Sequence, residues 1–199
     1  GSYAGCKGDS SGSKNMLNIA IGHCAGFCNA GDRNITLGWK AGWISGAGED
    51  NVIIGSEAGH CTTDGDDNVL IGKKAGFCQN SANLNTFVGR CAGYDANSGG
   101  GNAGLGADAL KQVEGNYNIG LGYAAGSDIT SGDRNIAIGC NVSLPSATGD
   151  TQLAIGMGST NWIEGNNLFN VGMGTASPTS KLHVVGDFLL TGIATAVDF

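Results

Sequence analysis

Cysteine, histidine and carboxylate side chains are the groups of this chain that could support metal, redox or acid–base chemistry. The sequence holds seven Cys, three His and 17 Asp and Glu in 199 residues. The cysteines form no C-x-x-C pair, so the usual zinc and dithiol spacings are absent. His23, His60 and His183 are isolated and lack the ligand spacing of a metal site. We therefore expect no cofactor, no metal and no enzymatic activity.

Two cysteines hold equivalent places in adjacent copies of a sequence repeat. Cys28, Cys61 and Cys78 each lie two residues after an Ala-Gly pair. Stacked strands are about 4.8 Å apart, which is within the Cα separation that a disulfide tolerates. Two interpretations remain open: a disulfide between Cys61 and Cys78 of neighbouring units, or small reduced thiols that fill a narrow interior. We favour the second.

The elements that must position these residues come from a repeat of about 17 residues. In nine copies an Asn is followed four residues later by Gly, and in a tenth the first residue is Gln152. A fixed period of this length predicts one small unit stacked on itself. The Asn copies start at Asn18, Asn34, Asn51, Asn68, Asn85, Asn102, Asn118, Asn135 and Asn170.

Each unit, or rung, begins with a short strand. Apolar residues alternate after the Asn, as in Ile19 and Ile21, and alternation of period two is typical of a β-strand. We expect these two residues to face the inside of the rung, and the residue between them, such as Ala20, to face outward against another chain. An Ala-Gly pair then predicts a tight corner. Bulky residues follow it and should stack along one edge: Phe27, Trp43, His60, Phe77 and Tyr94.

The leading Asn residues predict a ladder along the stack. The side-chain amide of each Asn can donate to the equivalent Asn on one side and accept from the one on the other side. A Gly-Asp turn such as Gly31-Asp32 closes the rung, with Asp capping its own backbone. We expect the structural ladder to consist of Asn18, Asn34, Asn51, Asn68, Asn85, Asn102, Asn118 and Asn135.

Charge and hydropathy together argue against two classes of partner. The net charge is −7, and there is no basic stripe that could neutralise nucleic-acid phosphates. No apolar run approaches the roughly 18 residues of a membrane-spanning helix. We therefore expect no nucleic acid and no membrane insertion.

The NxAIGxxAG unit, complete from Asn18, resembles the head repeats of trimeric bacterial adhesins and the closely similar repeats of phage tail fibres. The sequence GMGTASPTSKLHVVG, residues 172–186, resembles the segment that precedes a self-cleaving C-terminal chaperone domain in many tail fibres. The resemblance implies three chains packed as parallel β-rolls about a common axis. The opening GSYAG matches the GxxAG half of a repeat, so we expect residue 1 to lie inside a longer protein. The resemblance implies that Phe199 lies near a maturation boundary.

Together these features predict an all-β homotrimer: a parallel β-roll, or β-solenoid, over residues 1–176 with about 10–11 rungs, and an intertwined neck over residues 177–199. Strands in the neck are expected at Lys181–Val185 and Phe188–Thr191. We expect a structural and adhesive segment of a tail fibre, located on the virion, that attaches to a host-cell receptor, which we expect to be a glycan. The predicted contact loops are the insertion between Gly5 and Asn18 and the stretch Ser98–Gly101.

Three alternatives stay open. The first is the head of a trimeric adhesin on a bacterial surface, and the second is a monomeric scaffold or ice-binding solenoid. The third is a fibre that cleaves polysaccharide, which would need two opposed carboxylates in a groove. Trp39, Trp43 and Trp162 could stack on sugars, but we favour packing at the core or at corners.

Overall fold

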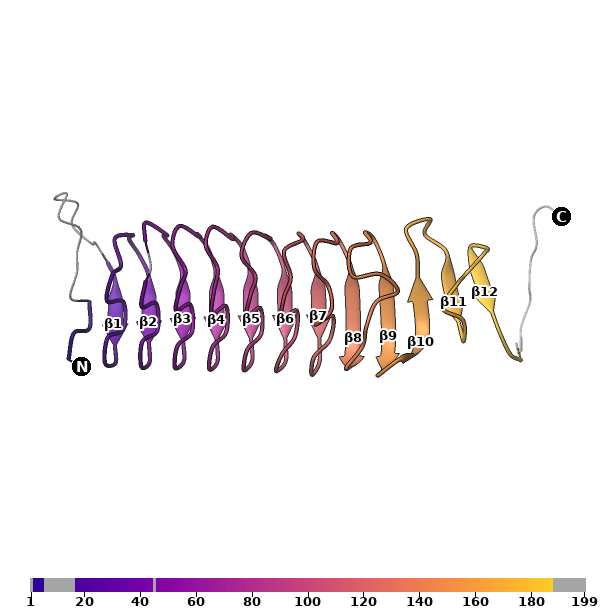
Figure 1. Cartoon of the computed structure of the whole chain (residues 1–199), viewed down its shortest axis with the longest axis horizontal. Helices are drawn as coiled ribbons and strands as arrows, with labels where there is room; N and C mark the ends of the chain where they lie inside the picture. The colour runs from indigo at the N-terminus through magenta and orange to yellow at the C-terminus, as the bar shows by residue number, and fades with distance from the viewer. Residues whose placement is uncertain (1, 6–16, 45, 188–199) are drawn as a thin grey trace.

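The computed structural model describes residues 2–5, 17–44 and 46–187. The described residues form one 12-stranded sheet in which each strand pairs with its neighbours in sequence, so the strands lie side by side along the long axis of the molecule (Figure 1). The all-β solenoid with a spacing of about 17 residues is confirmed. The strands are β1 (Ile19–Ile21), β2 (Ile35–Leu37), β3 (Val52–Ile54), β4 (Val69–Ile71), β5 (Thr86–Val88), β6 (Ala103–Leu105), β7 (Ile119–Leu121), β8 (Ile136–Cys140), β9 (Leu153–Met157), β10 (Thr160–Gly165), β11 (Val171–Met173) and β12 (Leu182–Val184).

The regular part of the solenoid is shorter than predicted. Eight successive parallel pairings join β1 to β9, and each sets equivalent repeat positions opposite one another, as in Val52 opposite Val69. Strand β10 then runs antiparallel to both β9 and β11. The copy at Asn170 therefore follows a reversed strand. The 18 residues between Gln152 and Asn170 contain the antiparallel hairpin of β9 and β10, which the Asn-to-Gly pattern does not predict.

The interior of each rung is lined by the middle residue of the strand, so the predicted orientation of the strands is wrong. Ile53, Leu70 and Phe87 are 1%, 0% and 0% exposed, whereas Ile21 and Leu121 in the flanking positions are 58% and 45% exposed. Alternation separates two faces but does not say which one is inside. A three-residue strand offers its middle side chain to the narrow interior and its two flanking side chains to the outer surface.

The glycine that ends each strand allows consecutive rungs to approach closely. At Gly72 the backbone has a φ of +133°, and an added Cβ would lie 2.5 Å from the carbonyl oxygen of Gly89 in the next rung. Both the torsion angle and the contact exclude a side chain at this point. Hydrogen bonds also join the Ala-Gly corners, as from the Gly59 N–H to the Ala75 carbonyl at 2.9 Å. The rungs are therefore bonded on more than one side.

In the interior, a large side chain in one rung packs over a small residue in the neighbouring rung. Phe87 fills the core at β5, and a Cβ on Gly104 in β6 would lie 2.9 Å from its Cδ1 atom. Farther along, Gly120 occupies the middle of β7, and the corner of the preceding rung reads Ala109-Leu110 in place of Ala-Gly. The Leu110 side chain packs over Gly120, where an added Cβ would meet its Cγ at 2.8 Å. Large and small residues thus keep the packing dense along the stack.

The predicted neck contributes one strand to the described sheet. Strand β12 lies within the predicted stretch Lys181–Val185 and pairs in parallel with β11 of the same chain. The second predicted stretch, Phe188–Thr191, lies outside the described residues, as does most of the insertion between Gly5 and Asn18.

The close approach of rungs predicts that Gly72→Ala is strongly destabilising. Both the positive φ and the clash with Gly89 oppose a methyl group, so we expect the free energy of unfolding to fall by about 3 kcal/mol or more. The control is Gly158→Ala, because Gly158 has a φ of +62° and nothing within 4 Å of its ideal Cβ. We expect it to cost about 1 kcal/mol. Urea unfolding followed by circular dichroism measures both, and equal losses would contradict this account.

Candidate functional site

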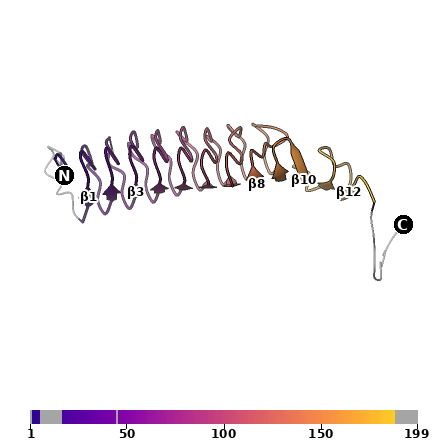
Figure 2. The ribbon, with the colours of Figure 1, turned by 90° about the horizontal axis from the view of Figure 1, so that it is seen from below.

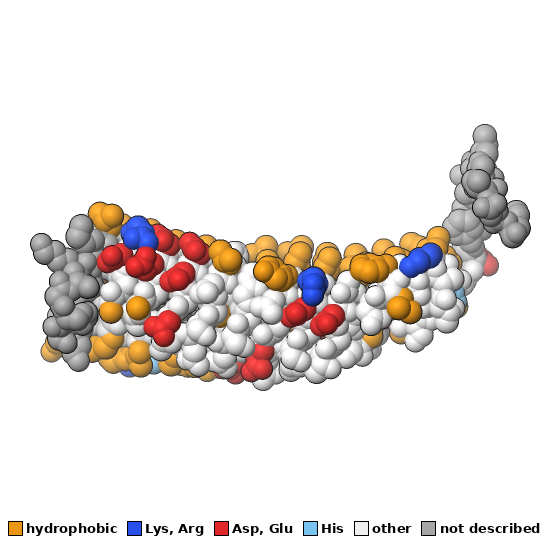
Figure 3. Space-filling view, turned by 90° about the horizontal axis from the view of Figure 1, so that it is seen from above, with side chains coloured by type: hydrophobic (Ala, Val, Ile, Leu, Met, Phe, Trp, Pro, Cys, Tyr) orange, Lys and Arg blue, Asp and Glu red, His pale blue; other side chains and the backbone are white. Residues whose placement is uncertain are grey.

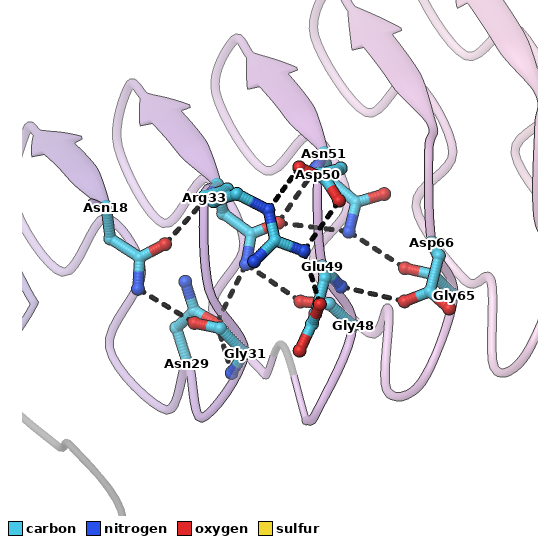
Figure 4. Close-up of polar contacts among 11 residues, drawn as sticks. Asn18, Asn29, Gly31, Arg33, Gly48, Glu49, Asp50, Asn51, Gly65 and Asp66 are labelled. Carbon is cyan, nitrogen blue, oxygen red and sulfur yellow. Dashed lines mark hydrogen bonds and ion pairs between the residues drawn. The ribbon is translucent and has the colours of Figure 1, made fainter. Parts of the chain in front are cut away.

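Hydrogen bonds from the leading Asn residues run along the whole parallel stack. In every rung from Asn18 to Asn135 the side-chain Oδ1 accepts from the backbone N–H of the equivalent residue in the next rung, at 2.7–3.0 Å. The Nδ2 of the same side chain donates at 2.8–2.9 Å to a carbonyl in the turn that closes its own rung, just before the next Asn or Gln of the column. Figure 4 shows both bonds for Asn18 and the turn bond for Asn51.

The ladder thus differs in detail from the predicted exchange between amides. Direct bonds between side chains do occur, as from Asn51 Nδ2 to Asn34 Oδ1 and from Asn68 Nδ2 to Asn51 Oδ1, both at 3.1 Å. The shorter bonds go to the backbone. Buried backbone groups need a partner, and the Asn side chain supplies one where the strand begins. Each of these side chains therefore bridges two rungs.

A second ladder lies in the turn, two residues before the Asn. Asp66 Oδ1 accepts from the backbone N–H of Glu49 in the preceding rung at 2.8 Å, and Asn83 Oδ1 accepts from that of Asp66 at 2.7 Å. Asp133 and Asp150 continue the pattern. At Asp66, Asp133 and Asp150 the side chain thus bonds to the preceding rung, contrary to the expectation that Asp caps its own backbone. The recurrent Asp or Asn at this position was the available sequence signal.

Acidic residues and one arginine gather at the surface beside this second ladder. Arg33 Nε donates to Asp50 Oδ1 at 2.7 Å, and its Nη2 donates to Glu49 Oε2 at 2.5 Å (Figure 4). The hydrogen bond from Arg33 lowers the pKa of Asp50. All three side chains are exposed, and exposed pairs add little to stability. We assign the cluster no chemistry.

The bulky residues after the Ala-Gly corners form a stacked aromatic ladder. Phe27 lies against Trp43 with ring centroids 5.0 Å apart, His60 lies 4.9 Å from Phe77, and Phe77 lies 4.9 Å from Tyr94. Burial lowers the pKa of His60; Glu57 opposes this shift, and the charges of Lys40 and Lys74 add to it. The imidazole is therefore neutral within the stack at neutral pH.

Cys61 and Cys78 are brought together as free thiols. The structure has six described cysteines, none of which forms a disulfide with another described residue. Burial and a hydrogen bond with the Cys61 thiol raise the pKa of Cys78 to about 11. Cys78 is thus protonated at neutral pH and is a poor nucleophile. A disulfide between the two stays the less favoured of the two alternatives.

The two flanking residues of each strand from β1 to β9 create an apolar surface, here called the outer sheet face. Ile19, Ile21, Leu37, Leu105 and Ile119 are each at least 40% exposed. Only Thr86 among the 18 flanking positions is polar, and none is charged. The strands follow one long side of the molecule in Figure 2, and hydrophobic side chains gather along one long edge in Figure 3. The sequence predicted an apolar contact surface, but on the wrong set of side chains.

The predicted contact residues have mixed environments. The stretch Ser98–Gly101 is held by hydrogen bonds from the Gly100 N–H to Asn116 Oδ1 and from the Gly101 N–H to the Asn83 carbonyl, each at 3.0 Å, and its role as a contact loop stays a prediction. Trp39 and Trp162 are 47% and 61% exposed, contrary to the expected packing. Trp43 lies in the aromatic ladder.

No group of three or more His, Cys, Asp and Glu side chains in the described part of the chain is arranged to hold a metal ion. The same residues contain no helix long and apolar enough to cross a membrane.

Loss of one ladder side chain should destabilise two rungs. Asn68 is fully buried, and Asn68→Ala would leave the Ala82 carbonyl and the Asn85 N–H without these partners. We expect a loss of about 2–4 kcal/mol in the free energy of unfolding. Asn80→Ala serves as the control, because Asn80 is exposed and its amide makes only a 3.4 Å side-chain bond to Asn97. Similar losses for the two variants in urea unfolding would contradict a special role for the ladder.

The buried imidazole predicts a specific loss of stability in mild acid. The pKa of His60 is lower in the folded protein than its ordinary value of 6.5, so the unfolded chain binds a proton first as pH falls. The stability contributed by His60 is therefore complete above pH 6.5 and declines below it. His60→Phe should show a smaller loss than the unsubstituted protein between pH 7.5 and pH 5.5 in urea titrations. An identical pH dependence in the two proteins would refute this assignment.

Comparisons with known proteins add no relative to these observations: no protein-family model, no curated protein and no solved structure matches the chain.

Proposed function

We propose that this chain is a structural and adhesive segment of a phage tail fibre, in which three copies form a rigid rod that attaches the virion to a host cell. The observation that carries the proposal is the outer sheet face, an uncharged strip of aliphatic side chains along nine parallel strands. Extended apolar strips of this kind on a protein surface mark sites of association. The resemblance of the repeat and of residues 172–186 to fibre sequences supplies the functional context.

The partner proposed for this face is a second and a third copy of the same chain. A second copy has the same spacing between rungs, so its aliphatic columns match over the whole length of the face. A partner with any other periodicity would fall out of step within a few rungs. The absence of charge from the flanking positions also permits this face to be buried without unpaired ions.

A rod of this kind suits multivalent attachment. The ladders join each rung to the next, so the shaft resists bending between the ends. Three identical binding surfaces on one rod engage the cell at the same time, and weak individual contacts then sum to a useful avidity. The same argument requires an extracellular location on the mature virion, where the fibre meets the cell.

Disrupting the outer sheet face should separate the trimer without unfolding the rungs. We expect sedimentation equilibrium to give three times the chain mass of 19.9 kDa for the unsubstituted protein and one chain mass for Leu121→Lys. Leu121 is already 45% exposed in the single chain, so a lysine there is tolerated by the fold. Leu84→Lys is the matched control, since Leu84 is 61% exposed but precedes a ladder Asn and lies off the outer sheet face.

The attachment role is tested with the same variants. Fluorescently labelled protein is incubated with a panel of bacterial strains, and retention on cells is measured by flow cytometry. We expect retention on a subset of strains, with at least about tenfold less for Leu121→Lys because avidity is lost. A monomeric unsubstituted protein would refute the trimer, and absence of retention on every strain would refute the attachment role.

A further inference from the structure

The aromatic ladder ends at Tyr94 with one ring face free of any aromatic neighbour. One face stacks on Phe77 at a centroid distance of 4.9 Å and an interplanar angle of 2°. The equivalent position in the next rung is Lys111, so the stack stops there. Lys74 Nζ also lies 6.0 Å from the centroid of the Tyr94 ring. Tyr94 is half-buried, and together with Lys111 it lines a recess at this end of the ladder.

A pocket of about 310 Å³ lies at this point. It is lined by Lys73, Lys74, Arg90, Cys91, Tyr94 and Lys111, which come from three successive rungs. The lining includes four basic residues and no carboxylate. The whole chain has only 10 Lys and Arg and a net charge of −7, so this concentration of positive charge is local.

Carboxylates behind the pocket position the basic groups but do not neutralise all of them. Asp108 is 8% exposed and pairs with both Arg90, at 2.5 Å, and Lys111, at 3.3 Å. Glu57 pairs with Lys74 at 3.5 Å. Lys73 is exposed and forms no ion pair with any described residue. Two carboxylates thus face four cations, which leaves an excess of positive charge at the pocket.

We propose that this pocket binds an acidic saccharide, with a sugar ring against Tyr94 and its carboxylate or sulfate on Lys73 and Arg90. An aromatic face suits the apolar C–H side of a pyranose ring. Charge-assisted hydrogen bonds from lysine and arginine suit the anionic group. The combination of a ring and cations in one recess favours a sugar that carries both features.

The surroundings of the pocket argue for a short saccharide unit over nucleic acid. A nucleic acid needs a basic track that follows many phosphates. Here the basic residues are confined to three rungs, and carboxylates dominate the rest of an acidic chain. This assignment rests on the proposed attachment role and names the chemical class of its receptor. Three pockets on a trimer would engage repeating units of one polymer.

Isothermal titration calorimetry with the intact protein tests the assignment. The probes are tetragalacturonate, which carries carboxylates, and a sulfated heparin tetrasaccharide, with neutral maltotetraose and a single-stranded tetranucleotide for comparison. We expect at least one acidic saccharide to bind at least about tenfold more tightly than either comparison probe, with an affinity that falls as salt rises. Equal binding of all probes, binding of the nucleotide alone, or no binding of the acidic saccharides would overturn the proposal.

Substitutions locate the binding in the pocket. We expect Lys73→Gln and Tyr94→Ala each to weaken the acidic saccharide by about tenfold, the loss typical of a charge-assisted contact. Arg134→Gln makes the same change of charge at an exposed position before a ladder Asn, away from the pocket, and should bind as the unsubstituted protein does. A loss in Arg134→Gln equal to that in Lys73→Gln would show a general charge effect and would overturn the assignment.

The failure of this site can be distinguished from failure of the attachment role. If the trimer adheres to cells and neither acidic saccharide competes, the pocket assignment is wrong and the attachment role stands. If acidic saccharides bind in calorimetry but the protein is retained on no strain, the pocket assignment stands and the attachment role is wrong.

Discussion

The stacking of each rung directly on the next, at the distance of paired strands, is the constraint on which the structure depends. The glycine that ends each strand permits this approach, since a Cβ at Gly72 would collide with the backbone of the next rung. The approach in turn places the backbone groups at the start of each strand within reach of the Asn side chains. Close contact between rungs and the polar ladders are thus two consequences of one geometry.

The same geometry leaves little room inside. Each strand gives one side chain to the interior, and volume is balanced between rungs, as where Leu110 fills the space over Gly120. The aliphatic residues that flank the middle position have no place within the rung. They lie on the outer sheet face, where Ile21 is 58% exposed. A rung that forms a narrow interior therefore creates an apolar exterior, which is the surface that we propose associates with other chains.

Side chains that take no part in the polar ladders are free to differ from rung to rung. At the corner column this freedom produces aromatic residues up to Tyr94 and then Lys111, and beside it Lys73 and Arg90 hold the same position in successive copies. A repeating scaffold thus brings residues about 17 apart in sequence into one pocket. The repeat pattern consists of the residues that the rungs share, whereas this basic column lies at positions where the rungs differ.

The sequence by itself determined the period, the strand positions, the Asn ladder residues and the aromatic column, because each depends on residues that recur in register. Only the tertiary structure decided which strand face is inside, since alternation is symmetric between the two faces. It alone showed that β10 is reversed, because an antiparallel hairpin fits within an 18-residue spacing as well as a parallel turn does. It also decided that Asp66 bonds to the preceding rung. The sequence does not specify whether a side-chain oxygen in a turn accepts from its own turn or from a neighbouring one.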